Sequence, residues 1–136
     1  MKLLMFAARH FDYRPFARTL PDGPDATGET EVHDAAVIFI HVEAEDEARR
    51  AKVLTKTLKN VKWLAGKRGL RNVVLHSFTH LSESKADPAF AQALLEELAE
   101  RLRSVGYQVW ITPFGWVCEW ELGVHGESLA KVFKSL

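Results

Sequence analysis

The sequence predicts an α/β domain in which helices pack against a mixed β-sheet. Ala35–Val42 is almost continuously apolar and rich in β-branched and aromatic residues, which is typical of a buried strand. Two later segments, 51–65 and 88–105, instead repeat apolar residues every three or four positions, as amphipathic helices do. These helix patterns alternate with further short apolar runs, and that order predicts strands and helices sharing one sheet.

The first part of the chain is predicted to be two strands joined by a loop. Leu3–Ala8 is short and apolar on both faces, which favours a central strand. Thr19–Thr30 carries two prolines and two glycines, so it is predicted to be a turn-rich loop. This loop could carry a hairpin whose second arm is Thr30–His33, ahead of the strand at Ala35–Val42.

A long helix is expected to start near Glu43–Asp46, because acidic side chains favour the N-terminal end of the helix dipole. Its apolar face is predicted to comprise Ala51, Leu54, Leu58, Val61 and Ala65. Gly66 and Gly69 bracket the end of this helix. The apolar segment Asn72–His76 then predicts another buried strand.

Pro88 is suited to the first position of the second helix, and Asp87 to its N-terminal cap. The buried face of this helix is predicted to comprise Ala91, Leu94, Leu98, Leu102 and Val105. Gly106 should end it.

The last third of the chain should begin with a strand at Tyr107–Thr112 and a sharp break at Pro113–Gly115. Trp116–Leu122 alternates as a strand does, with Trp116, Cys118, Trp120 and Leu122 on one face. Gly123–Gly126 is predicted to be a turn. A short C-terminal helix is predicted to carry Leu129, Val132, Phe133 and Leu136.

Composition narrows the possible functions. The 136 residues suit a single domain, residues 1–136, large enough to bury a core. Lys+Arg and Asp+Glu number 18 each, which argues against nucleic-acid binding by bulk charge alone. A single cysteine excludes an internal disulfide and a cysteine-rich zinc site, and fits a cytoplasmic location. No apolar run is long enough to span a membrane.

The predicted ligand site is the stretch Asn72–Pro88, where an apolar strand changes into a small polar loop that leads to a helix. In open α/β sheets such a loop is where ligands bind. His76 and His80 are four residues apart but not on a helix, and no third ligand is evident, so a zinc site is not expected. His41 reads as a satisfied core or pocket-edge residue. His80 lies in the loop itself and is a candidate functional residue, although bonding to nearby backbone is an equally good reading.

The other reactive groups have a structural interpretation. Cys118 lies between two tryptophans on one strand face, and this placement favours a small buried side chain over a catalytic thiol. Trp116 and Trp120 are more simply core or dimer contacts than base-stacking surfaces. No glycine-rich phosphate loop and no GxSxG motif occurs. No cofactor is expected, and no metal is expected because His76 and His80 lack a third ligand.

Several short motifs together resemble a known family. They are Phe78-Thr79-His80-Leu81-Ser82, then Pro88 and the helix with Ala91, then Gly106-Tyr107-Gln108-Val109, Pro113-Phe114-Gly115, and Gly126 with Leu129-Ala130. In this combination the chain resembles the N-terminal editing domain of archaeal threonyl-tRNA synthetases. That family is similar in fold to the D-aminoacyl-tRNA deacylases.

The resemblance implies an editing deacylase that removes serine wrongly attached to tRNA(Thr). A missing methyl group is worth only ~1–3 kcal/mol in a pocket, roughly 10–200-fold, so a second hydrolytic site is needed. The resemblance places Phe78 and Thr79 (backbone) and His80 at the reacting ester. It places the substrate-binding walls at Val42, Phe78, Thr79, His80, Ala91, Pro113, Phe114, Gly115, Trp116, Val117 and Cys118. The family is thought to use the 2′-OH of the terminal ribose to position the attacking water.

Three positions depart from the family pattern. Cys118 stands where the family has a lysine, Lys131 stands where it has a glutamate, and Ala7-Ala8 replaces a His-Ser pair. Either activity is lost or side chains at these positions do not drive the reaction. The second option is chemically reasonable, because backbone donors can stabilise the oxyanion whatever the side chains are.

Two alternatives remain, namely a D-aminoacyl-tRNA deacylase and a module that binds the tRNA end without catalysis. The expected partners are the 3′ end of tRNA(Thr) carrying serine, the remainder of a threonyl-tRNA synthetase in cis or in trans, and a second copy in a homodimer. No basic surface is evident in the sequence, so tRNA affinity is expected to come largely from elsewhere.

Overall fold

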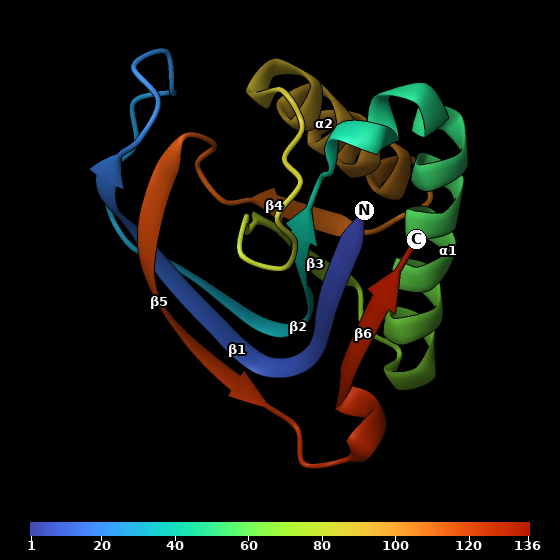
Figure 1. The fold of residues 1–136 in the computed structure, drawn as a ribbon. Coiled ribbons are helices and arrows are strands. Elements are labelled where there is room, and N and C mark those ends of the chain that lie inside the picture. Colours follow the sequence, from blue (N-terminus) through green and yellow to red (C-terminus); the bar gives the residue numbers. More distant parts are fainter.

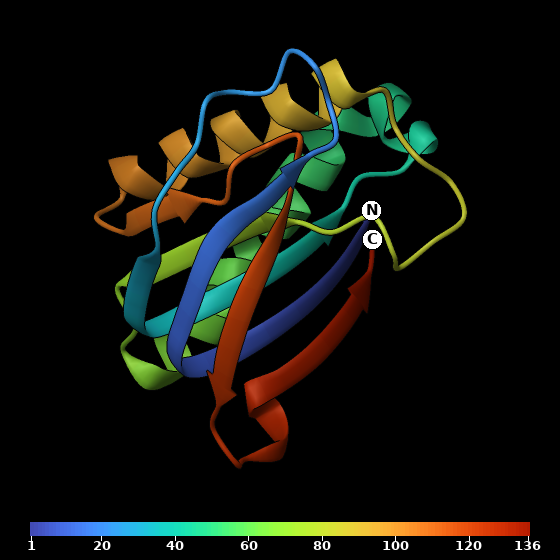
Figure 2. The same cartoon turned by 90° about the vertical axis from the view of Figure 1, so that its left-hand side faces the viewer.

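The computed structural model describes residues 1–136 as one sheet with two α-helices on a single face (Figures 1 and 2). The elements in order are β1 (Lys2–Arg18), β2 (Thr30–His41), η1 (Ala44–Arg49, a 3-10 helix), α1 (Arg50–Arg68), β3 (Asn72–Ser77), α2 (Pro88–Ser104), β4 (Gln108–Ile111), β5 (Trp116–Val124), η2 (Ser128–Ala130, 3-10) and β6 (Lys131–Ser135). The expected α/β class with a mixed sheet is confirmed.

The strand order is β4-β3-β2-β1-β5, with β6 also paired to β1. β2, β3 and β4 are parallel, whereas β1 is antiparallel to each of its neighbours. The carboxyl ends of the three parallel strands therefore lie at the same edge of the sheet, and the loops that follow them meet there.

β1 is much longer than predicted, because it continues through Ala8 to Arg18. A register shift between Ala8 and His10 marks a bulge where the strand bends. The half before the bend pairs with β6 and the half after it pairs with β5 (Figure 1). The expected hairpin forms, and its second arm runs without interruption into the Ala35–Val42 strand as β2.

Both helices form where the apolar periodicity predicted them and cover the main core. Asp87 caps α2 by accepting a hydrogen bond from the Ala89 N–H at 3.1 Å, and Gly69 ends α1 with a φ of 63°. Two assignments to the buried faces were wrong. Ala51 is exposed in the first turn of α1, and Val105, at the C-terminal cap of α2, is 50% exposed, because neither position lies over the sheet.

The C-terminal helix predicted around Leu129–Leu136 was wrong. Lys131–Ser135 forms β6, paired with residues 2–6 of β1, and only η2 precedes it. β5 also extends to Val124, so the turn predicted from Gly123 begins later. A single helical turn is weak in isolation, and pairing with the free edge of β1 satisfies the same backbone groups in the sheet.

The two termini lie side by side (Figures 1 and 2). The Leu136 N–H donates to the Met1 carbonyl at 2.9 Å, and Arg49 donates to the Leu136 carbonyl at 2.8 Å. No helix in the structure is both long enough and apolar enough to cross a membrane.

Candidate functional site

A pocket of about 530 Å³ lies where the β3–α2 loop, the β4–β5 turn and the tip of the β1–β2 hairpin meet. The structure brings all the predicted binding residues to its wall, namely Val42, Phe78, Thr79, His80, Ala91, Pro113, Phe114, Gly115, Trp116, Val117 and Cys118. Their placement together agrees with the sequence-based site, and their roles remain predictions.

His41, at the end of β2, fixes the β3–α2 loop through two hydrogen bonds. Its side chain is fully buried, and its Nδ1 accepts from the Leu81 N–H at 3.0 Å while its Nε2 lies 2.6 Å from the Ser84 carbonyl. Since one nitrogen accepts and the other donates, the ring is a neutral imidazole with the proton on Nε2. The prediction of a satisfied core histidine is confirmed, and His41 positions the loop.

Glu43 anchors the same loop through charge. Its carboxylate accepts from the Met1 ammonium at 2.6 Å, from Lys2 at 3.2 Å and from the Ser82 hydroxyl at 2.7 Å. Burial alone would raise the pKa of Glu43, but the hydrogen bonds from the ammonium, Ser82 and Lys2 outweigh it and lower the pKa to about 2. Asp46 is also buried and accepts from the same ammonium at 3.0 Å.

The backbone N–H groups of the loop divide into used and free donors. The Phe78 N–H donates to the Ile40 carbonyl at 2.9 Å, so it cannot serve a developing oxyanion as the sequence analysis expected. The N–H groups of Thr79 and His80 have no acceptor within the protein. Both residues line the pocket, which leaves these two groups as the candidate oxyanion donors.

The two pocket histidines lie in different environments. His80 is exposed and its ring contacts Phe78 edge-on, with centroids 4.9 Å apart. His76 is buried beside Phe39, and its Nδ1 lies 2.9 Å from the Thr112 hydroxyl. Burial lowers the pKa of His76 to about 4, so this ring is neutral near pH 7.

The side of the pocket formed by β5 is fixed by a contact with the β1–β2 loop. Trp116 donates its indole N–H to the Pro24 carbonyl at 2.7 Å, which makes Trp116 a structural contact as well as a pocket residue. Gly115 has a φ of 82°, and a Cβ there would lie 3.0 Å from the Leu20 Cβ, so the turn requires glycine. Cys118 is half-buried, and burial raises the pKa of its thiol, which disfavours the thiolate.

Eight further lining residues had not been named as binding residues, namely Thr19, Leu20, His76, Ser77, Lys85, Ala86, Pro88 and Trp120. Five of them lie within the predicted stretch Asn72–Pro88, and only Thr19, Leu20 and Trp120 lie outside it. Thr19 and Leu20 reach the pocket because both of their N–H groups donate to the Gly115 carbonyl in the β4–β5 turn. Contacts between such distant segments leave no local signal in the sequence. Lys85 is the single Lys, Arg, Asp or Glu residue of the lining. It is exposed and forms no ion pair within the protein.

Two of the three positions that depart from the family pattern lie outside the pocket. Ala7 and Ala8 are fully buried in β1, opposite β2. Lys131 donates to the His125 carbonyl at 2.9 Å, at the start of β6. Cys118 alone of these residues lines the pocket. No group of three or more His, Cys, Asp or Glu side chains is arranged to hold a metal ion.

A family model and the curated relatives of this chain indicate the same family. A family model described as the archaea-specific editing domain of threonyl-tRNA synthetase matches residues 1–136. Among curated relatives, the threonine–tRNA ligases of Hyperthermus butylicus and Thermofilum pendens are 31% and 30% identical over 99% and 100% of this chain. The chain spans only 23% and 22% of the length of these relatives.

The fold also occurs among solved structures. A protein named c-Myc DNA unwinding element binding protein aligns over 100% of this chain and 99% of its own, with a TM-score of 0.69 and 11% identity. At this identity the likeness concerns the fold alone.

Proposed function

The chain belongs to the archaea-specific editing domain family of threonyl-tRNA synthetase, a class of aminoacyl-tRNA deacylase, and from this premise we propose that its pocket hydrolyses seryl-tRNA(Thr). The observation that carries the proposal is the pair of free N–H donors, Thr79 and His80, at a pocket without any carboxylate. Such a site can orient an ester and stabilise its oxyanion, and none of its lining hydroxyl or thiol groups is hydrogen-bonded to a histidine.

The attacking water is then positioned by the substrate. The terminal ribose carries a 2′-OH next to the esterified oxygen, within hydrogen-bond reach of a water that attacks the carbonyl carbon. The tetrahedral oxyanion accepts from the N–H groups of Thr79 and His80, and collapse releases serine and the free 3′-OH. His76 is neutral near pH 7 and lines the same pocket, where it can donate or accept one hydrogen bond without adding charge.

Selection against threonine follows from the walls. Val42, Ala91 and Phe78 present apolar surface close to the loop donors. A wall that contacts the serine Cβ leaves no space for an additional methyl group, and overpacking a rigid site costs ~1–3 kcal/mol. We assign His80 to the serine hydroxyl, because it is an exposed side chain next to the free donors whose imidazole can donate or accept a hydrogen bond.

Lys85 completes the site as its single full charge. Glu83 and Asp87 flank it in sequence, but neither is within ion-pair distance, and Asp87 caps α2 instead. An unpaired ammonium at the rim suits the phosphodiester group that precedes the terminal adenosine of tRNA. We assign Lys85 to that phosphate.

The test is deacylation of three charged tRNAs, carrying serine, threonine or a D-amino acid. The proposal expects hydrolysis of the seryl ester and sparing of the threonyl ester. Hydrolysis of the D-aminoacyl ester alone would instead identify a chirality filter. Lack of hydrolysis with retained binding of the tRNA end would identify a binding module.

A further inference from the structure

Helix α1 concentrates positive charge on a chain whose net charge is zero. It carries Arg50, Lys52, Lys56, Lys59, Lys62, Lys67 and Arg68 and no Asp or Glu. Arg50 pairs with Glu97 and Arg68 pairs with Glu127, whereas the five lysines form no ion pair. This basic surface is not evident from the sequence totals, because equal numbers of acidic and basic residues conceal a charge that the fold gathers on one helix.

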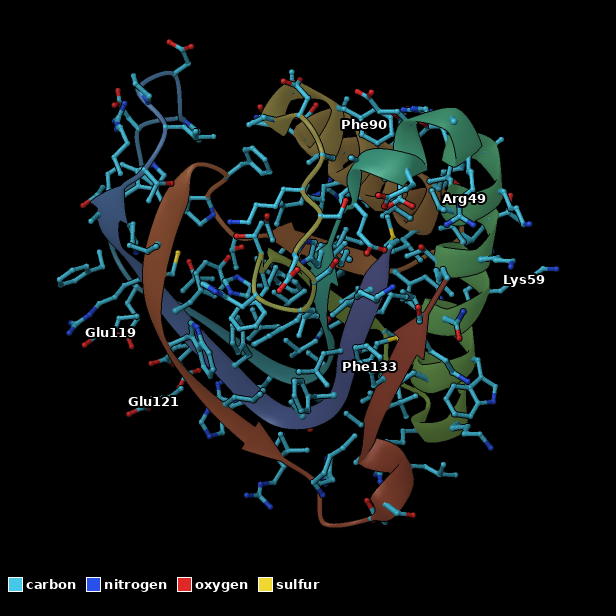
Figure 3. All side chains as sticks on the ribbon, in the orientation of Figure 1. Arg49, Lys59, Phe90, Glu119, Glu121 and Phe133 are labelled. Atoms are coloured by element: carbon cyan, nitrogen blue, oxygen red, sulfur yellow. The ribbon has the colours of Figure 1, made fainter.

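Four of these lysines form a stripe along the helix. At 3.6 residues per turn, Lys52, Lys56, Lys59 and Lys67, here called the lysine stripe, lie within an arc of about 80°. All four are exposed, and Figure 3 shows Lys59 pointing outward from α1, away from the sheet. None of them lines the pocket.

The stripe is unfavourable to the isolated domain. Lys52 and Lys56 are four residues apart, and Lys56 and Lys59 are three apart, so like charges are neighbours on the helix surface. Such pairs destabilise a helix, and exposed helices commonly relieve them with interleaved glutamates. α1 has no such residue, so no acidic neighbour on the helix offsets this repulsion.

An aromatic side chain lies within the same arc. Trp63 is 39% exposed, and its ring carries the Lys67 ammonium at 5.1 Å and that of Lys134, from β6, at 6.0 Å. The two ammonium groups are thus held in place over a fixed platform rather than left on free side chains. This arrangement extends the basic surface from α1 onto β6.

We propose that the lysine stripe with Trp63 and Lys134 binds the phosphodiester backbone of RNA. The choice of RNA rests on the proposed function, whose substrate is a tRNA. A row of unpaired ammonium groups along one helix matches the repeating charge of a nucleic-acid strand, and such contacts bind without reading sequence. The stripe would hold the body of the tRNA while the pocket holds its 3′ end.

The experiment measures binding of an uncharged, fluorescently labelled RNA hairpin by anisotropy, between 50 and 200 mM salt. With about four phosphate contacts, the parent should lose affinity by ~100-fold across this range. A variant with Lys52, Lys56, Lys59 and Lys67 replaced by Gln should bind at least ~10-fold more weakly at 50 mM and lose most of the salt dependence.

Two controls test whether RNA binding depends on the positive charge of the lysine stripe itself and not on the total charge of the protein. The matched Lys→Arg variant at the same four positions keeps the charge and should bind as the parent does. Arg9→Gln removes an exposed, unpaired charge from β1 and should leave the hairpin affinity unchanged. The Gln variant should melt no lower than the parent, because its neighbouring like charges have been removed.

Hydrolysis distinguishes this inference from the proposed function. The Gln variant should hydrolyse a short aminoacylated oligonucleotide at the parent rate and show a raised KM for full-length aminoacyl-tRNA only. Equal RNA binding by the parent and the Gln variant would overturn the inference, as would equally tight binding of polyglutamate to the parent. RNA binding needs no catalysis, so an inactive parent would contradict the proposed function and leave this measurement intact.

Discussion

His80 is the side chain on which serine recognition is proposed to depend. It is exposed at the pocket, and its side chain has no hydrogen-bond partner within the protein. The alternative that His80 serves only to hydrogen-bond the loop backbone therefore has no support. His80→Ala should slow seryl-tRNA deacylation and weaken the preference for serine over threonine by ~1–3 kcal/mol, the cost of a lost hydrogen-bond partner. Rates on both esters measure this effect. His33→Ala, at an exposed position of β2, is the control. A parent-like rate and preference in His80→Ala would make His80 merely structural.

Cys118 occupies the position where the resemblance expects a lysine, and its chemistry argues against a nucleophile. Burial raises the pKa of the thiol, so the thiolate is scarcer near pH 7 than for a free cysteine. Cys118→Ala should therefore hydrolyse seryl-tRNA at close to the parent rate. Replacing the terminal 2′-OH of the tRNA with hydrogen should nearly abolish hydrolysis by both proteins. An inactive Cys118→Ala together with a reactive deoxy substrate would establish covalent cysteine chemistry.

Lys85 is the only Lys, Arg, Asp or Glu residue of the pocket lining, and we assigned it to a tRNA phosphate. Lys85→Met should lower kcat/KM for seryl-tRNA by about 10-fold at low salt and reduce the dependence of log(kcat/KM) on log[salt] by about one. Lys85→Arg should retain both values, since the charge is kept. The assignment to a phosphate fails if Lys85→Met keeps the salt dependence of the parent.

At the level of the elements, the β3–α2 loop was predictable because its signals are local. An apolar strand gives way to Ser77–Ser82, and Asp87-Pro88 then starts a helix whatever the rest of the chain does. β6 was not predictable, because the apolar residues Leu129, Val132, Phe133 and Leu136 suit a short helix equally well and only the free edge of β1 decides between helix and strand. Lys85 was overlooked for a related reason, since its approach to the pocket depends on the path of the folded loop.

Because Glu43 anchors the same loop, the stability of the fold should depend on whether Glu43 is ionised. Its pKa is about 2 in the folded chain and 4.5 ordinarily, so the unfolded chain takes up the proton first as pH falls. The stabilisation is therefore complete above about pH 4.5 and is lost as the pH falls through that value toward 2. Urea unfolding of the parent between pH 6 and 2.5 should show this decline.

Glu43→Gln should unfold more readily at pH 6 and show a shallower decline across the same window, because it has no carboxylate to protonate. Glu83→Gln is the control, since Glu83 is an exposed member of the same loop with no ion pair. If the parent and Glu43→Gln lose stability equally between pH 4.5 and 2.5, the ion cluster around Glu43 does not stabilise the fold.

For the molecule as a whole, the two faces of the sheet differ in how they are covered. α1 and α2 cover one face, and their apolar residues join those of β1 in the larger core cluster. The other face, here called the open face, carries a smaller buried cluster with Phe11 and Phe39 at its centre and no helix over it. Trp120 packs against both rings at 6.0 and 5.3 Å and is still 38% exposed.

The open face continues onto β6 and predicts a homodimer. Phe133 is directly opposite Leu4 in the β1–β6 pairing, so the two side chains share a face, and Leu4 packs against the smaller cluster. Phe133, labelled on β6 in Figure 3, is 53% exposed. It leaves a large aromatic group in water on a face that already exposes Trp120. Contiguous apolar surface of this kind marks a contact with another protein. The simplest such contact is a two-fold symmetric dimer, in which the open faces of two copies pair with each other.

Light scattering at micromolar concentration should therefore give twice the 15.4 kDa chain mass. Phe133→Lys should shift the mass toward that of one chain, because it places a charge in an apolar contact without touching the pocket. Val105→Lys is the matched control, since Val105 is 50% exposed at the end of α2, away from the open face, and its mass should equal that of the parent. A parent mass near 15.4 kDa would show that the open face meets water or a different protein.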